Sequence, residues 1–125
     1  MANILLIDDS PSVVQALGYY LETLGYAVIP AHDGRSGLKL AAERRPDLIL
    51  LDLEMPLLSG VAVCRALKAD PALSQLPVVM MTGQATQEVR KQGLAAGAVV
   101  VLSKPFDLEL MRTTVARQIP GTEEA

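Results

Sequence analysis

Apolar positions follow two patterns along the chain, short aliphatic runs and longer stretches in which apolar residues recur at helical spacing. The short runs are bounded by turn residues and are typical of strands that are buried on both faces of a sheet. They fall at 3–7, 27–31, 48–52, 77–82 and 99–102. The longer stretches predict helices at 11–24, 34–45, 60–69, 87–96 and 108–119.

Strands and helices alternate strictly, which predicts an α/β fold with helices on both faces of a parallel sheet. Right-handed crossovers leave few topologies. Among them, the flavodoxin-like doubly wound (βα)5 arrangement has the strand order 2-1-3-4-5 and places the first and third strands side by side. We expect one domain over residues 1–120 and a short polar tail over 121–125, because 125 residues suit a single core.

The central strand ends in a carboxylate, Asp52, and the next turn contains Met55 and Pro56. In an open α/β sheet, ligands bind at the edge formed by the carboxyl ends of the strands. Other polar residues stand at or just past the ends of the first, fourth and fifth strands: Asp8, Asp9, Thr82 and Lys104. Because neighbouring strands lie about 4.8 Å apart, we expect these side chains to gather along one edge.

Three carboxylates that lie close together raise each other's pKa unless a cation compensates their charge. An all-oxygen cluster suits Mg²⁺, and a divalent ion beside Lys104 and Thr82 can stabilise a phosphoryl group. Asp52 is then a possible nucleophile. Each residue also has a simpler interpretation, since Asp8 and Asp9 can cap the following helix and Lys104 can be a solvated surface charge.

Composition narrows the range of partners. The formal charge is -3, the pI is near 5.0 and no run of basic residues occurs, which argues against direct contact with nucleic acid or with an anionic membrane. A single cysteine, Cys64, cannot form an internal disulfide, and the chain has no long apolar span. These features predict a cytoplasmic protein whose partners are proteins or small anions, with Cys64 as a buried apolar residue.

The polar residues and their spacing match a family. The residues that carry the resemblance are Asp8-Asp9, the strand ending at Asp52 with Met55-Pro56 and Gly60 after it, Thr82-Gly83 and Lys104-Pro105-Phe106. The chain closely resembles the receiver domain of bacterial two-component response regulators. The resemblance covers essentially the whole chain. It implies that Asp52 accepts a phosphoryl group from a histidine kinase or phosphotransfer protein and that the chain then switches contacts with a downstream target or output domain.

The resemblance also implies individual roles. Asp9 would bind Mg²⁺ directly, Asp8 through water, and Glu54 through its backbone carbonyl, while Thr82 and Lys104 would contact phosphoryl oxygens. Lys104-Pro105 corresponds to a peptide bond that is usually cis in the family, so the resemblance implies a cis bond here. The protein would be a signalling switch and not an enzyme, apart from self-phosphorylation and autodephosphorylation at Asp52, either alone or as a receiver from a longer protein.

The last strand departs from the family pattern. Val101 stands where an aromatic switch residue is common, and Val99 and Val100 stand where acids are frequent. A bare apolar edge strand favours docking, so we expect an output face on the fourth helix, fifth strand and fifth helix, with Val99, Val101 and Phe106 meeting a protein partner or a second copy. In the alternative interpretation, the flanking helices bury these valines.

Three other functions fit part of this pattern. A small-molecule phosphatase with an aspartate nucleophile would need a second aspartate two residues after Asp52, where this chain has Glu54. A flavin-binding domain would need a phosphate loop after the first strand, where Asp8 and Asp9 place two negative charges. A receiver-like scaffold that is never phosphorylated is supported only by Val101.

Overall fold

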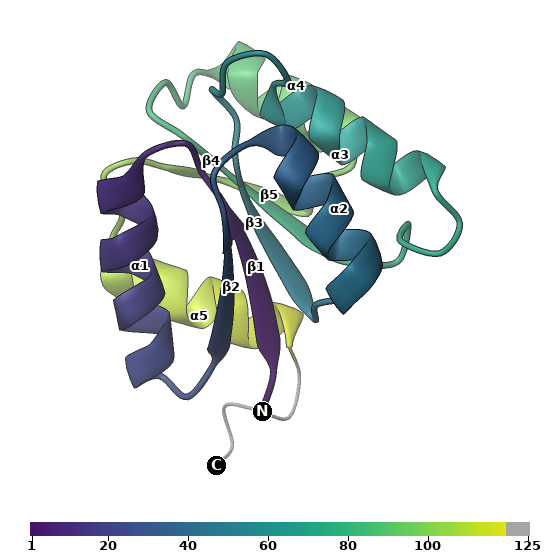
Figure 1. Ribbon diagram of the computed structural model, residues 1–125. Coiled ribbons are helices and arrows are strands. Elements are labelled where there is room, and N and C mark those ends of the chain that lie inside the picture. The colour runs from purple at the N-terminus through teal and green to yellow at the C-terminus, as the bar shows by residue number, and fades with distance from the viewer. Residues whose placement is uncertain (120–125) are drawn as a thin grey trace.

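Five parallel strands form a sheet at the centre of the molecule in the order β2-β1-β3-β4-β5, which confirms the predicted topology (Figure 1). The structure is a computed structural model that describes residues 1–119, so the predicted tail at 121–125 lies outside the described residues. The strands are β1 (Asn3–Ile7), β2 (Ala27–Ala31), β3 (Leu48–Asp52), β4 (Val78–Thr82) and β5 (Val100–Ser103). The helices are α1 (Pro11–Thr23), α2 (Gly34–Arg44), α3 (Gly60–Ala69), α4 (Gln87–Ala96) and α5 (Leu108–Gln118).

Two strands differ from the prediction by one residue. β4 begins at Val78, after Pro77, because proline has no N–H to give to the ladder, although the Pro77 carbonyl still accepts from Ile49. β5 begins at Val100 and extends to Ser103, which pairs with the last residue of β4. β5 therefore ends at the residue directly before Lys104.

The sheet separates two apolar cores. Leu5 and Ile7 of β1 point to the core under α2, α3 and α4, and Ile4 and Leu6 point to the core under α1 and α5, as the alternation of side chains along a strand requires. Figure 1 shows the two groups of helices on opposite faces of the sheet. All residues of β3 and β4 are buried, and Cys64 packs in the first core as predicted.

Helix starts follow the capping pattern. Ser10, Asp33, Ser59, Thr86 and Asp107 each precede a helix, and each side chain accepts a hydrogen bond from the backbone N–H three residues further on. The longest helix in the described part of the chain has 13 residues, and no helix there combines the length and apolar character needed to cross a membrane.

The predicted output face needs correction. Val101 is only 3% exposed because its side chain points into the core under α4. Gly93 of α4 has no side chain, which lets this helix pack closely against Val101 of β5. A Cβ at Gly93 would lie 2.8 Å from the Val101 Cγ2 atom. Phe106 packs against the opposite core, beside α1, so it does not share a surface with Val101. Of the three residues, Val99 is exposed, at 47%.

The carbonyl of Val101 has a partner on α4. The Arg90 guanidinium donates a hydrogen bond from Nη1 to this oxygen at 2.7 Å. The alternative interpretation, in which helices bury the valines at 99–101, is correct for Val101, partly correct for Val100, which packs against the core under α1 and α5, and wrong for Val99.

Candidate functional site

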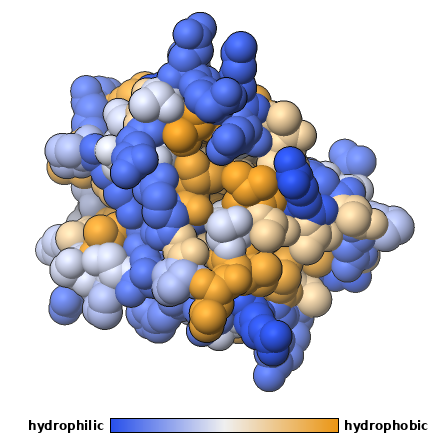
Figure 2. All heavy atoms as spheres, turned by 90° about the horizontal axis from the view of Figure 1, so that it is seen from above, coloured by the Kyte–Doolittle hydropathy of each residue, from blue (hydrophilic) through white to orange (hydrophobic). Residues whose placement is uncertain are grey.

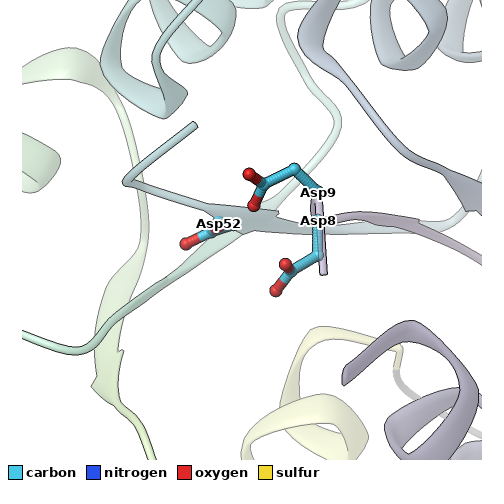
Figure 3. A group of neighbouring side chains, drawn as sticks. All are labelled: Asp8, Asp9 and Asp52. Atoms are coloured by element: carbon cyan, nitrogen blue, oxygen red, sulfur yellow. The ribbon is translucent and has the colours of Figure 1, made fainter. Parts of the chain in front are cut away.

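Three carboxylates meet at the carboxyl edge of the sheet. β1 and β3 are neighbours with Ile7 opposite Leu51, so the residues that follow them also lie side by side. Asp8, Asp9 and Asp52 each offer an oxygen atom within 4.8 Å of the others. Figure 3 shows Asp8 and Asp9 pointing to different sides of the end of β1, with Asp52 beside them on the neighbouring strand. The sequence-based prediction of this cluster is confirmed.

Burial separates the roles of the three acids. Asp8 and Asp52 are 0% and 2% exposed, whereas Asp9 is open to solvent. The Asp8 carboxylate accepts a hydrogen bond from the backbone N–H of Ser10 at 2.9 Å, which shapes the turn into α1, but the helix cap itself is Ser10. Capping therefore does not account for Asp8, whose other oxygen faces the site.

Lys104 provides the positive charge inside the cluster. Its Nζ atom lies 2.9 Å from Asp8 Oδ2 and 3.3 Å from Asp52 Oδ1. Burial lowers the pKa of the Lys104 ammonium, but the hydrogen bond to Asp8 and the charge of Asp52 outweigh this effect, so the net pKa is raised. The lysine stays charged and is not a solvated surface group. The expected cis bond between Lys104 and Pro105 is confirmed.

Asp52 is the acid whose ionisation the site opposes. Burial, followed by the charge of Asp8, raises its pKa to about 6, although Lys104 acts in the other direction. The backbone N–H of Glu54 donates to Asp52 Oδ1 at 3.3 Å and also favours the charged form. One ammonium therefore leaves the negative charge of the cluster uncompensated, a condition that a divalent cation relieves.

Gly60 holds the end of β3 against the start of α3. A Cβ atom at this position would lie 2.4 Å from the backbone carbonyl oxygen of Asp52 and 2.7 Å from the Cα of Leu53. The Gly60 N–H donates to the Leu53 carbonyl at 3.0 Å. Only glycine fits this close approach, so the helix fixes the backbone that carries Asp52.

Thr82 ends β4, next to β3, and its side chain is turned toward Glu54. The Thr82 hydroxyl donates to Glu54 Oε2 and accepts from the Gln84 N–H, and the N–H of Gly83 donates to Glu54 Oε1 at 3.1 Å. Sequence reasoning assigned Glu54 only through its backbone carbonyl and missed its carboxylate. The available signal was its position just after β3, beside the end of the adjacent strand.

An apolar groove adjoins the site. Its volume is about 850 Å³, and it lies between α1 and the segment that follows β5, with Tyr20, Phe106 and Leu108 among its lining. Lys104 lines it as well, so the groove and the acidic cluster share this residue. Seen from above, this end of the molecule has apolar side chains at its middle and along one side, with hydrophilic ones around them (Figure 2).

The sequence has many relatives. Residues 4–116 match the family described as response regulator receiver domain. Protein PilH of Pseudomonas aeruginosa is 36% identical over 121 residues, which are 97% of this chain and 100% of PilH. The DNA-binding dual master transcriptional regulator RpaA of Synechocystis is 39% identical over 123 residues, which are 98% of this chain but only 51% of RpaA. The chain thus spans about half the length of that relative.

Solved structures of similar fold include a chemotaxis protein and a receiver domain. Chemotaxis protein CheY4 of Vibrio cholerae has a TM-score of 0.90 and 34% identity, with 95% of this chain and 99% of that chain covered. The receiver domain of sensor histidine kinase PA1611 from Pseudomonas aeruginosa has a TM-score of 0.88 and 31% identity, with 94% and 97% covered. That structure has a magnesium ion coordinated in its active site cleft.

Proposed function

The chain belongs to the family of response regulator receiver domains, and from this premise we propose that its Asp52 accepts a phosphoryl group in a Mg²⁺-dependent reaction. Phosphorylation of an aspartate is the general function of this family, whose members interact with histidine kinases and with output or target proteins. The observation that carries the proposal is the buried Asp52 carboxylate, held 3.3 Å from Lys104 at the strand edge where two further acids meet.

The acidic cluster fits a magnesium ion. Receiver domains bind Mg²⁺ at an acidic site, and the three aspartates offer the oxygen ligands that this ion prefers. We assign Asp9 and Asp52 as direct ligands together with the backbone carbonyl of Glu54, and Asp8 as a ligand through water. When bound, the ion supplies positive charge that stabilises the oxygens of a phosphoryl group during transfer.

The transfer itself forms one bond and breaks one. An oxygen of Asp52 bonds to phosphorus while the bond from phosphorus to the donor's histidine nitrogen breaks, and the nitrogen keeps that electron pair. Asp52 has to be ionised to attack, and a pKa of about 6 leaves most of it ionised near neutral pH. Lys104 and Thr82 then bind phosphoryl oxygens as hydrogen-bond donors.

The phosphoryl group acts as a switch in this proposal. Its acceptance changes contacts with a protein target or an output domain, and the only catalysis is self-phosphorylation and autodephosphorylation at Asp52. We propose that output uses the surface of α4, β5 and α5 around Val99, without the buried Val101 and without Phe106, and that a protein target or a second copy docks there. Direct contact with nucleic acid is not part of the proposal, and the cytoplasmic location predicted from the sequence stays a prediction.

Intact mass spectrometry tests the proposal. The protein is incubated with phosphoramidate, with and without Mg²⁺, beside Asp52→Ala and the matched control Asp47→Ala, which removes an exposed aspartate just before the same strand. We expect a Mg²⁺-dependent gain of one phosphoryl mass in the wild type and the control and none in Asp52→Ala. If folded wild-type protein that binds Mg²⁺ gains no phosphoryl mass, the proposal is refuted and the receiver-like scaffold that is never phosphorylated is favoured.

A further inference from the structure

The carboxylate of Glu54 occupies two hydrogen-bond donors at the end of β4. Its Oε2 accepts from the Thr82 hydroxyl and its Oε1 accepts from the Gly83 N–H at 3.1 Å, so both oxygens are bound at once. Thr82 is fully buried, whereas Glu54 is exposed. Two donors at the end of β4, the buried hydroxyl of Thr82 and the backbone N–H of Gly83, therefore bind an exposed carboxylate from the neighbouring loop.

The same pair of donors lies beside the phosphoryl acceptor. β3 and β4 are paired with Asp52 opposite Met81, so Thr82 stands one residue beyond the direct neighbour of Asp52. Adjacent strands are about 4.8 Å apart, a span that a phosphoryl group on the Asp52 oxygen covers. Lys104 Nζ, the third donor near Asp52, contacts Asp8 and Asp52 and is not bound by Glu54.

We propose that the Glu54 carboxylate is an internal competitor of the phosphoryl group, which binds Thr82 and Gly83 in the unphosphorylated chain and has to leave them when Asp52 is phosphorylated. This inference rests on the proposed function of Asp52. Carboxylate and phosphoryl oxygens are both anionic acceptors, so the same donors suit either group. They cannot hold both groups, because the two anions would repel each other and each donor has one proton to give.

The competition affects both states of the switch. In the unphosphorylated state, the bonds from Thr82 and Gly83 stabilise the resting arrangement and slow phosphorylation. In the phosphorylated state, the exposed Glu54 side chain leaves these donors and turns away from β4, so its negative charge takes a new position on the surface of the loop that follows β3. This displaced charge is a difference between the two states that a partner protein can detect.

The rate of phosphorylation tests the competition. With phosphoramidate and Mg²⁺, we expect Glu54→Ala to be phosphorylated about tenfold faster than the wild type, a ratio that corresponds to about 1.4 kcal/mol, with Glu54→Gln in between because it keeps one acceptor. The matched control is Glu43→Gln, an exposed glutamate at the far end of α2, which should leave the rate unchanged. Equal rates in the wild type and Glu54→Ala would overturn the inference.

A second measurement separates competition from a simple loss of negative charge. If Glu54 acts through the donors, the acceleration caused by Glu54→Ala should shrink in a Thr82→Ala background, where one donor is already missing. The amide of Gly83 should also exchange with solvent faster in Glu54→Ala than in the wild type, without any phosphodonor. An acceleration that Thr82→Ala leaves unchanged, or a Gly83 exchange rate that Glu54→Ala does not alter, would overturn the inference.

These outcomes are distinct from failure of the proposed function. If the wild type and Glu54→Ala both remain unphosphorylated, the proposal for Asp52 fails. If both are phosphorylated at one rate, only the competition fails.

Discussion

Replacing Asp52 by asparagine should stabilise the protein in the absence of divalent ions. The wild-type carboxylate is buried, and burial together with the charge of Asp8 raises its pKa to about 6. An aspartate in the unfolded chain has a pKa of about 3.9, so its pKa is about 2 lower than in the folded protein. This difference corresponds to about 3 kcal/mol of tighter proton binding in the folded state. Asparagine has the shape of the protonated acid and can still accept a hydrogen bond from Lys104.

The effect depends on pH in a defined direction. Below about pH 4, Asp52 is protonated in both states and the folded protein has the full benefit of its raised pKa. Between about pH 4 and pH 6 the unfolded chain loses the proton first, so the wild type loses stability as the pH rises. The variant has no such titration, and its advantage should grow over this window to about 1–3 kcal/mol and then stay constant.

Urea unfolding in EDTA, repeated from about pH 4 to pH 8, measures this advantage. Asp33→Asn is the matched control, because backbone N–H donation from Ser36 lowers the pKa of that exposed acid. The stability from Asp33 is present at neutral pH and fades on acidification, so its variant should show the opposite trend. The reasoning would be refuted if Asp52→Asn differed from the wild type by the same amount at every pH, or if it were less stable at neutral pH.

Three further substitutions test the charge of the site, the packing of α4 on β5 and the packing of α3 on β3, each by urea unfolding. Lys104→Met should cost about 1–3 kcal/mol by leaving a buried carboxylate without its cation, and added Mg²⁺ should restore more stability to it than to the wild type; an equal response would contradict this. Gly93→Ala should cost about 1–3 kcal/mol by crowding Val101, and Val101→Ala should relieve part of that cost, whereas strictly additive effects would exclude the contact. Gly60→Ala should lower both stability and Mg²⁺ affinity, measured by calorimetry, while Gly18→Ala, whose Cβ would meet an atom only at 3.6 Å, should be tolerated.

The periodicity of apolar residues was enough to predict the fold. Each strand is an aliphatic run and each helix has one apolar stripe, so the alternation fixed a parallel sheet and hence the edge at which Asp52 and Lys104 meet. Strand ends were less certain because they depend on pairing. Ser103 belongs to β5 because it lies opposite Thr82, and a pattern within one strand cannot predict its neighbour's length.

Side-chain direction was the part that the sequence could not supply. Val101 alternates toward the core under α4, and its burial depends on Gly93, a residue in another element. Phe106 follows β5 in a loop and turns to the opposite side of the sheet, where no periodicity applies. The position of the Glu54 carboxylate depends on a rotamer and on donors from β4. These features arise from contacts between elements, which a single sequence does not display.

The ion pair between Lys104 and Asp8 joins residues that are 96 positions apart. Lys104 follows the last strand, so the acidic cluster at the ends of β1 and β3 has this cation only while β5 is docked on β4. Local opening of β5 would therefore leave the buried carboxylates of Asp8 and Asp52 without this cation, even with the other four strands in place.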